Sequence, residues 1–569
     1  MANPEVTRPG AGTAAGSYVL GAGTLISAAA AVCLAQVALA IPAVLNGMFT
    51  TDLGPTSSQL TWITDAFLVP VCLLELTFGV LGDLFGRKRL LIIGAVVLAI
   101  GEVIAVVTPG AGSATGTRVL VLWIGQIISG IGAAALFPTS LAMVAAGTHT
   151  ARRRAGAVSV WAAALSFGGT VSSVLGGLVS RAHFGSDPNA GWRWAFVVVA
   201  VLALASAVLT TVTARDSAAP AGRSLDWPGQ VTVAVALFAL LFGVVQGPTS
   251  GWGSSEVVAG FVVALVFAVA FIWAERRATA PLLRLDLFGN RAFAVAAAVT
   301  VLAMFAFLGA AYTTSIRLSA IQGFSPLKTS IAFLFLNGMA LVLLPVTARL
   351  LAGLNPKWPL SAGGLLMAAG CLWLAAVPAT NLSLAPVIVP FLLVGMGFAL
   401  AVSSVTAVAV NTVPNHLAGM ASGSTNMLRD FGFTLGPAIV GAVALSQAAA
   451  RISGALAGSP ALRAALASFS AAPAHVPAAQ RPSVAAAVGA VNSGPLGANA
   501  VPATVPGPGG KPVPFNPLQG VAFHALSHGY AIGYLICGIA ALVAALLALL
   551  AVRGEVRETL LDPQTLAGS

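Results

Sequence analysis

Charged residues that stand inside long apolar runs are the first candidates for chemistry. The sequence holds Asp65, Glu75, Glu102, Arg429 and the adjacent Asp430 in such runs. Burying a charge in a membrane costs several kcal/mol, so intramembrane charges are functional candidates by default. A buried acid can carry a proton, and a buried cation can hold an anionic group. These residues are therefore candidates for proton coupling or substrate binding.

Each of these residues also has a plainer interpretation. Asp65 lies near the end of its run, where water could solvate it. Glu102 could serve only as a structural hydrogen-bond partner between helices. Glu75 lies deeper in its run, which favours a role in coupling or substrate binding. Arg429 could bind substrate or pair with Glu75 or Asp430. Consecutive helical residues point about 100° apart, so Arg429 and Asp430 need not pair directly.

Uncharged side chains could complete a cavity around these charges. The amide candidates are Gln36, Gln126 and Asn337. Three aromatic residues could line an apolar binding region, although packing or lipid contact explains them more simply: Phe305, Phe307 and Phe335.

The sequence offers no enzyme active site. It contains no nucleophile elbow, no metal-ligand cluster and no phosphate-binding glycine loop followed by Lys and Ser or Thr. The four cysteines lie in apolar runs without metal-ligand spacing. We therefore expect no enzymatic activity, no bound metal and no cofactor.

Composition identifies the elements that must hold these residues. The chain has 569 residues, of which 58% are hydrophobic and only 8% are charged. A soluble domain has about a quarter charged residues, so this surface must face lipid. The net charge of +11 would suggest a nucleic-acid partner in a soluble protein. Here the basic residues cluster between apolar runs, so we expect membrane lipids and no nucleic acid as partners.

A spanning helix needs about 20 mostly apolar residues. Runs of that length predict about fourteen helices in an all-α integral membrane protein. The predicted spans are 22–46, 60–82, 90–108, 118–146, 155–180, 192–213, 228–246, 256–274, 292–314, 328–350, 359–378, 384–410, 417–445 and 528–552.

The placement of Lys and Arg predicts an orientation. With an even number of spans, the clusters Arg87–Arg89 and Arg152–Arg154 lie on one side, together with most of the other basic residues. Basic loops stay in the cytoplasm. We therefore expect cytoplasmic tails at 1–21 and 553–569. Residues 447–527 are rich in Ala, Pro, Ser and Gly, and we expect a long, loosely structured, low-complexity extracellular loop there. A tolerated insertion is the simpler interpretation of this loop, and a cap that guards the substrate is the alternative.

An ordered motif follows the second predicted span. Its glycines allow close helix approach and a turn, and its charges can latch one conformation and release in another. Membrane anchoring by the basic residues alone is the alternative. The predicted gating loop consists of Gly79, Gly82, Asp83, Gly86, Arg87, Lys88 and Arg89.

This loop resembles the signature loop of the major facilitator superfamily. The stretches QLTWITDAF, GWRWAF, LDWPG, GWGS, ERRATAPLLRLDLFGNRAF and ASGSTNMLRDFGFTLGPAIVGA resemble its fourteen-helix drug:proton antiporter branch. The resemblance implies two six-helix bundles, 22–213 and 292–552, with an inserted helix pair at 228–274. It also implies a substrate site between the bundles and transport by alternating access.

Three features of that branch are missing from this sequence. Cys33 stands where the first helix usually carries Asp, and Gln126 where the fourth helix usually carries Arg. Ser172 and Ser173 replace the usual Gly-Pro pair of the fifth helix. Because the Asp of the first helix and the Arg of the fourth are both absent, neither charge is left in the membrane without its partner. Glu75 or Asp430, acids at positions that are usually neutral, could then carry the proton instead.

The resemblance favours a monomeric exporter of amphipathic, lipophilic small molecules, driven by protons and located in the cytoplasmic membrane. An exporter or facilitator of one endogenous metabolite or lipid, without proton coupling, is the alternative that the three departures support. A receptor or scaffold would need a folded soluble domain, and the sequence shows none at either end.

Overall fold

The structure is a computed structural model of the chain. It describes residues 20–148, 151–179, 182–185, 187–218, 225–279, 281–283, 285–353, 355, 357–411, 418–478, 480–506 and 511–551. The predicted C-terminal tail 553–569 and nearly all of the N-terminal tail 1–21 lie outside these residues.

The first part of the chain folds into six long helices, which we call the N-terminal half. They are α1 (Ala22–Leu53), α2 (Ser57–Phe85), α3 (Arg87–Val106), α4 (Thr115–Ala146), α5 (Ala151–Val179) and α6 (Arg193–Thr213), with the short η1 (Pro188–Trp192) before α6. Two further helices follow as an inserted pair, α7 (Trp227–Ser250) and α8 (Ser255–Arg277).

The remaining helices form the C-terminal half. They are η2 (Leu285–Gly289), α9 (Arg291–Ser315), the π-helical η3 (Ile316–Ile321), α10 (Pro326–Val342), α11 (Leu344–Gly353), α12 (Lys357–Ala376), α13 (Ala385–Asn411), α14 (Ala418–Gly458) and α18 (Gln519–Ala551). Between α14 and α18 lie α15 (Pro460–His475), α16 (Arg481–Asn492), α17 (Pro495–Ala500) and the strands β1 (Thr504–Pro506) and β2 (Pro512–Pro514).

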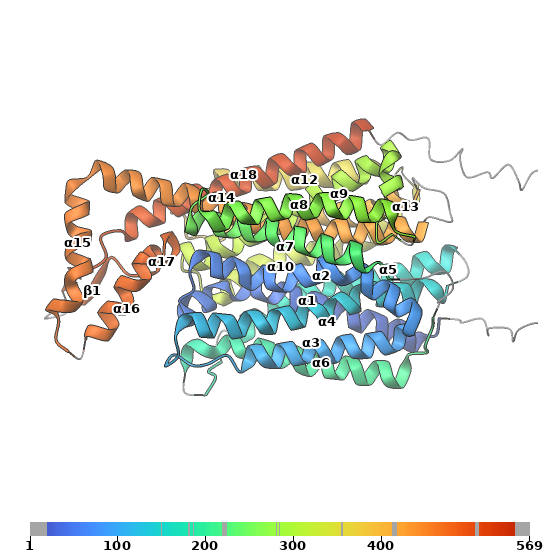
Figure 1. Ribbon diagram of the computed structural model, residues 1–569, viewed down its shortest axis with the longest axis horizontal. Coiled ribbons are helices and arrows are strands. Elements are labelled where there is room, and N and C mark those ends of the chain that lie inside the picture. Colours follow the sequence, from blue (N-terminus) through green and yellow to red (C-terminus); the bar gives the residue numbers. More distant parts are fainter. Residues whose placement is uncertain are drawn as a thin grey trace, which may run out of the picture.

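The long helices run side by side along one axis (Figure 1). Within the N-terminal half α4 packs on α2 and α3, and within the C-terminal half α9, α14 and α18 pack together. The halves meet where α5 packs on α10 and α2 packs on α14. Large apolar side chains such as Ile93, Val212 and Leu265 are exposed on the outside of the bundle. Lipid must cover that surface, so the fold is that of an all-α membrane protein, as predicted.

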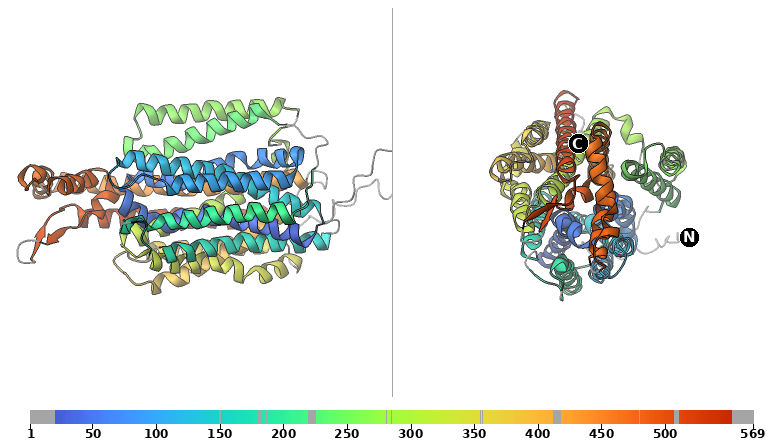
Figure 2. Two further views of the ribbon diagram at one scale, coloured as in Figure 1. Left: turned by 90° about the horizontal axis from the view of Figure 1, so that it is seen from below. Right: turned by 90° about the vertical axis from the view of Figure 1, so that its left-hand side faces the viewer.

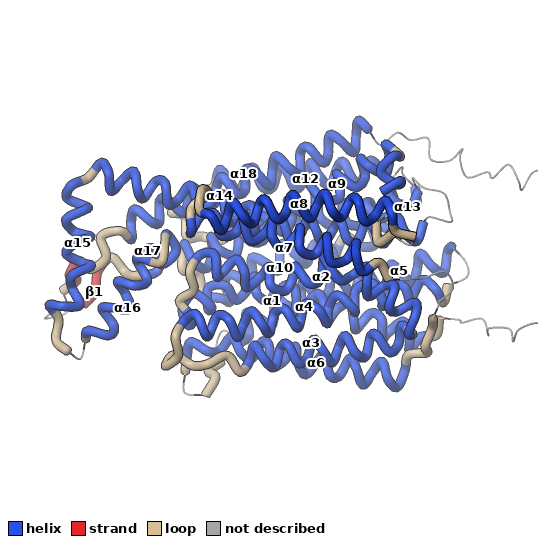
Figure 3. Tube along the Cα trace, viewed as in Figure 1, coloured by secondary structure: helices blue, strands red, loops and turns tan. Residues whose placement is uncertain are grey.

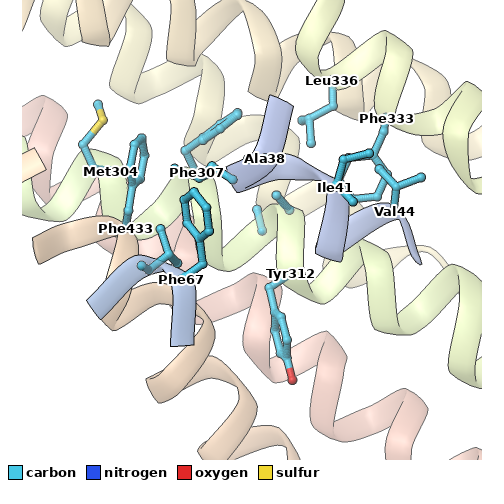
Figure 4. Packing of buried hydrophobic residues seen from close by; sticks show 14 of the residues in the cluster. Ala38, Ile41, Val44, Phe67, Met304, Phe307, Tyr312, Phe333, Leu336 and Phe433 are labelled. Carbon is cyan, nitrogen blue, oxygen red and sulfur yellow. The ribbon is translucent and has the colours of Figure 1, made fainter. Parts of the chain in front are cut away.

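Buried apolar side chains from both halves form one continuous core. Figure 4 shows Ala38, Ile41 and Val44 of α1 beside Phe333 and Leu336 of α10. Contact between helices that are so far apart in sequence holds the two halves together.

Thirteen helices in the described part of the chain are long and apolar enough to cross a membrane. The predicted span 328–350 is missing from this set because it is broken into α10 and α11 at Leu343. Pro345 explains the break, since proline has no N–H to continue the helical hydrogen bonds. The predicted span is present as two consecutive helices, so the described residues remain consistent with about fourteen spans.

The prediction of a loosely structured segment at 447–527 is also wrong. Its first residues extend α14 to Gly458, and its other described residues include α15, α16, α17, an antiparallel pair of short strands and the start of α18 (Figure 3). Ala-rich stretches favour helix, and Phe469, Val491, Val501 and Leu518 supply a small apolar core. We call residues 459–518 the cap, and the end of the bundle that carries it the cap end (Figures 1 and 2).

Candidate functional site

A cavity of about 240 Å³ lies between the two halves. The N-terminal half contributes residues of α1, α4 and α5, and the C-terminal half contributes residues of α9, α10, α11, α13 and α14. Val158 near the start of α5 and Thr425 near the start of α14 belong to its wall. The cavity therefore extends toward the end of the bundle opposite the cap, which we call the loop end.

Three charged residues meet beside this cavity. The Arg429 guanidinium donates from Nε to Asp430 Oδ1 at 2.8 Å and from Nη2 to Asp430 Oδ2 at 3.1 Å. Arg429 Nη2 also lies 3.6 Å from Glu75 Oε1 of α2. Arg429 and Asp430 line the cavity, whereas Glu75 lies behind them and is only 1% exposed. We call these three residues the charge cluster.

The helices explain how residues so distant in sequence meet. The sulfur of Cys72, one turn before Glu75, is 4.0 Å from the carbonyl oxygen of Met427 on α14. This close packing of α2 on α14 brings the Glu75 carboxylate to Arg429. Although adjacent helical residues diverge by about 100°, the long Arg429 side chain folds back onto Asp430. Three of the five predicted charges thus form one cluster that bridges the two halves.

The cluster is not balanced in charge. One guanidinium faces two carboxylates, and Glu75 Oε2 finds no hydrogen-bond donor among the described residues. Both carboxylates contact the same Arg429 guanidinium. A single proton held by the pair would neutralise the cluster and supply the missing donor.

Aromatic side chains form another part of the cavity wall. The rings of Phe307 and Phe398 stack with centroids 3.7 Å apart and planes 14° apart, and Phe433 lies 6.3 Å from Phe398. Met304 lies beside Phe307 and Phe433 (Figure 4). Of these, the sequence suggested only Phe307 as a candidate. The sequence did not indicate Met304, Phe398 or Phe433, because nothing local distinguishes an apolar side chain that lines a cavity from one that packs in the core.

Two of the three amide candidates line the cavity, and the third does not. Gln36 lines the cavity. Asn337 also lines it and donates from Nδ2 to Gly169 O and Ser173 Oγ, both at 3.3 Å, across the contact of α10 with α5. Gln126 does not line this cavity. It is fully buried in α4, and neither amide atom has a hydrogen-bond partner among the described residues.

The two remaining acids lie away from the charge cluster. Asp65 is 0% exposed, so its interpretation as a solvated interfacial residue is wrong. Glu102 is 1% exposed on α3, and its carboxylate oxygens have no hydrogen-bond partner among the described residues. The nearby Ser129 hydroxyl donates instead to Leu98 O at 3.4 Å. Neither residue lines the cavity described above.

The predicted gating loop forms a polar network at the loop end. Gly86 takes a φ of 101°, which favours glycine, and turns the chain between α2 and α3. Arg87 Nη2 lies 2.7 Å from Asp83 Oδ1, and the Lys88 backbone N–H donates to Asp216 Oδ1 at 3.0 Å. Asp216 belongs to the segment that leads toward the inserted pair. The loop therefore connects α2 to that segment, and Arg89 is exposed beside it.

The cap end is closed by close contacts between uncharged groups. Asn46 Nδ2 of α1 donates to Ser315 Oγ of α9 at 2.9 Å, and the hydroxyls of Thr61 and Tyr312 share a hydrogen bond of 2.8 Å. A Cβ atom added to Gly47 would lie 2.7 Å from Ser319 Cβ. We call this contact between the halves the outer seam. The cavity is therefore separated from the cap end.

Two helical halves with a cavity and a charge cluster between them define a transporter that works by alternating access. The described residues hold no group of three or more His, Cys, Asp or Glu that could bind a metal. The chain belongs to the Major Facilitator Superfamily, because the model of that family matches residues 26–437.

Relatives of this chain include antibiotic-resistance proteins. It is 30% identical over 384 residues to the multidrug resistance protein Stp of Mycobacterium tuberculosis, with 68% of each chain covered. It is 28% identical over 426 residues to the tetracenomycin C resistance and export protein of Streptomyces glaucescens, covering 74% of this chain and 76% of that one. These relatives agree with the resemblance to drug-exporting members of the superfamily.

Solved structures share the fold at low identity. A bacterial homologue of the human lysosomal transporter Spinster, inward-facing and unoccupied, matches with a TM-score of 0.59 and 13% identity, covering 93% of this chain and 96% of that one. The proton:xylose symporter XylE matches with a TM-score of 0.54 and 14% identity, covering 93% and 95%.

Proposed function

We propose that this transporter exports amphipathic, lipophilic small molecules across the cytoplasmic membrane in exchange for protons. In this proposal the loop end and both termini face the cytoplasm, and the protein works as a monomer surrounded by membrane lipids. The multidrug resistance protein Stp and the tetracenomycin C resistance and export protein are similar to this chain, and their names support an export function.

The observation that carries the proposal is the charge imbalance beside the cavity. Arg429 faces both Asp430 and Glu75, so the cluster has a net charge of −1 when all three are ionised. It is neutral when the two carboxylates share one proton. A site that alternates between these two states can exchange a proton for a substrate.

The exchange follows from competition for the same cluster. A substrate that enters between the halves and offers a hydrogen-bond donor or a positive charge to Asp430 replaces the stabilising effect of the proton. The proton then leaves toward the cytoplasm. After the halves rearrange, a new proton from outside takes the place of the substrate and resets the transporter. Thermodynamic linkage requires that each ligand weakens the binding of the other by the same factor.

The cavity chemistry fits amphipathic compounds. Phe307, Phe398 and Phe433 offer apolar ring faces, and Gln36 and Asn337 offer neutral polar groups. Most ligand sites combine a mainly apolar lining with a few polar groups that orient the ligand.

A second candidate function is uncoupled transport of a single metabolite or lipid. Cys33, Gln126, Ser172 and Ser173 occupy the positions that usually carry the coupling residues of the antiporter branch. If the charge cluster serves only to hold α2 on α14, transport would continue without a proton gradient.

Efflux measurements on cells that express the protein separate the two functions. We expect a fluorescent lipophilic dye to accumulate less in these cells, and an ionophore that collapses the proton gradient to abolish the difference. Glu75→Gln and Asp430→Asn should each reduce gradient-driven efflux at least about tenfold, since each removes a group that holds the proton. Glu256→Gln, which changes an exposed acid on α8, is the matched control.

The outcomes point to different functions. Full gradient-driven efflux by both cluster variants would refute the proposed coupling site. Efflux that is insensitive to the ionophore would favour the uncoupled alternative. No change in accumulation for any class of compound would refute drug export.

A further inference from the structure

One short helix of the cap, α17, packs against the bundle. The segment between α14 and α18 projects away from the long helices (Figure 1), yet α17 lies against α2, α14, α18 and η3. It thus contacts the N-terminal half through α2 and the C-terminal half through the other three helices.

Polar and apolar contacts hold α17 on the C-terminal half. Asn499 is 8% exposed and donates from Nδ2 to the carbonyl oxygens of Ala320, at 2.9 Å, and Ile321, at 3.4 Å. Both carbonyls lie in η3, the π-helical end of α9. Leu496 is 3% exposed and belongs to the same core cluster as the membrane-spanning helices, not to the small core of the cap.

Gly494, just before α17, contacts the N-terminal half at the start of α2. A Cβ atom added to Gly494 would lie 3.8 Å from the Ser57 hydroxyl oxygen, and Ser57 is only 3% exposed. Four residues further along α2, Thr61 forms its hydrogen bond to Tyr312 in the outer seam. The start of α17 therefore covers the outer seam at the point where α2 meets the C-terminal half.

The rest of the cap holds α17 in a fixed place. Asn516 donates from Nδ2 to Ala498 O and Val501 O, both at 2.8 Å, and accepts the Leu518 N–H at Oδ1 at 2.9 Å. Phe469 and Phe515 pack edge to face with ring centroids 5.1 Å apart. These contacts join α17 to α15 and to the start of α18.

We propose that α17 seals the cap end of the transport path, and that Asn499 and Leu496 are positioning residues that stabilise the closed outer seam. Alternating access requires α2 to separate from α9 and η3 when the cap end opens. A helix held on η3 and resting on Ser57 must release α2 at that moment. A stronger or weaker contact between α17 and η3 therefore changes the equilibrium between the closed and open states.

An isosteric substitution tests the polar contact. Asn499→Asp keeps the size of the side chain but replaces the amide donor by a carboxylate, which cannot donate to Ala320 O and Ile321 O. The matched control is Asn492→Asp, the same change at an exposed position of the cap. Leu496→Ala removes the apolar contact independently.

The readout is the exposure of Ser57. With Ser57→Cys as a reporter in purified protein, the rate of labelling by a hydrophilic maleimide measures how often the start of α17 releases α2 at the outer seam. A parallel protein without Ser57→Cys corrects for the native cysteines. We expect Asn499→Asp to raise the labelling rate about tenfold, because a lost hydrogen bond to a buried carbonyl shifts an equilibrium by this order. Leu496→Ala should raise it similarly, and Asn492→Asp should leave it unchanged.

Unchanged labelling in Asn499→Asp or in Leu496→Ala, with the same elution volume and melting temperature as the parent, would overturn the proposal. If one variant does not fold, the other decides. An equal rise with Asn492→Asp would also overturn it, because added negative charge would then explain the effect. The inference rests on alternating access and not on the proton or drug assignment, which the efflux measurements test separately.

Discussion

The two ends of the contact between the halves are built from different chemistry. The part of this contact that opens toward the loop end holds the cavity, its aromatic wall and the charge cluster, in which two carboxylates share one guanidinium. The outer seam has uncharged pairs such as Asn46–Ser315 and Thr61–Tyr312 and a close approach at Gly47, with one buried acid, Asp65, a turn after Thr61 on α2. Neutral hydrogen bonds can form and break at modest cost, whereas a buried charge needs a partner in every state. In the proposed mechanism the outer seam controls access, while the charge cluster responds to what occupies the cavity.

The largest effect should follow from removing the cation of the charge cluster. Arg429→Ala leaves Glu75 and Asp430 without a counter-charge, and breaking a buried ion pair in this way costs about 3–5 kcal/mol. We expect a lower melting temperature in detergent and a poor yield of folded protein. Arg276→Ala, which removes an exposed arginine of α8, should have little effect.

A rescue experiment shows whether charge is the cause. Adding Glu75→Gln and Asp430→Asn to Arg429→Ala removes the uncompensated charges and should restore most of the lost stability. If the triple variant is as unstable as Arg429→Ala, the side chain of Arg429 acts through packing and the electrostatic account of the cluster is wrong.

A smaller effect should follow from filling space in the outer seam. In Gly47→Ala the new methyl group would meet Ser319 Cβ at 2.7 Å, so the two halves must move apart. Overpacking of this kind costs about 1–3 kcal/mol in the closed state. Labelling of a cysteine at Ser57 should therefore become several times faster.

Gly338→Ala is the control for this substitution, since nothing lies within 4 Å of a Cβ added to Gly338 on α10. It should leave labelling unchanged. If Gly47→Ala labels no faster than this control, close approach at Gly47 does not hold the cap end shut.

The smallest effect should come from one neutral hydrogen bond of the outer seam. Tyr312→Phe removes the hydroxyl that meets Thr61, and Thr61→Val removes its partner. Each should destabilise the closed state by about 1 kcal/mol. In a double-mutant cycle the combined variant should lose less than the sum of the two, with a coupling of about 0.5–1.5 kcal/mol. Strict additivity in thermal unfolding would contradict a direct bond between these hydroxyls.

The sequence predicted the fold well because lipid imposes a strong pattern on it. Every spanning helix needs a long apolar run, and such runs are visible without any tertiary information. The break at Leu343 was missed because proline is tolerated in most membrane helices, as Pro42 and Pro70 show inside α1 and α2. The cap was missed because its polar, Ala-rich composition resembles that of disordered segments, while its small core depends on a few apolar residues such as Phe469 and Val491.

The site was predicted only in part. The charges of Glu75, Arg429 and Asp430 stood out against their apolar surroundings, but nothing local shows that residue 75 meets residue 429. Gln126 and Gln36 are both amides inside apolar runs and were both predicted to line a cavity, yet only Gln36 lines it. Which face of a helix turns inward depends on its neighbours, and that information lies in packing between distant segments.

In the proposed exchange, the carboxylates of the charge cluster carry the proton that substrate displaces. Its most direct test is proton release from purified, weakly buffered protein when a transported compound is added, followed with a pH-sensitive dye. We expect about one proton to be released per substrate bound by the parent, and none by the Glu75→Gln/Asp430→Asn double variant. Parent-like proton release from a double variant that still binds the compound would contradict the claim.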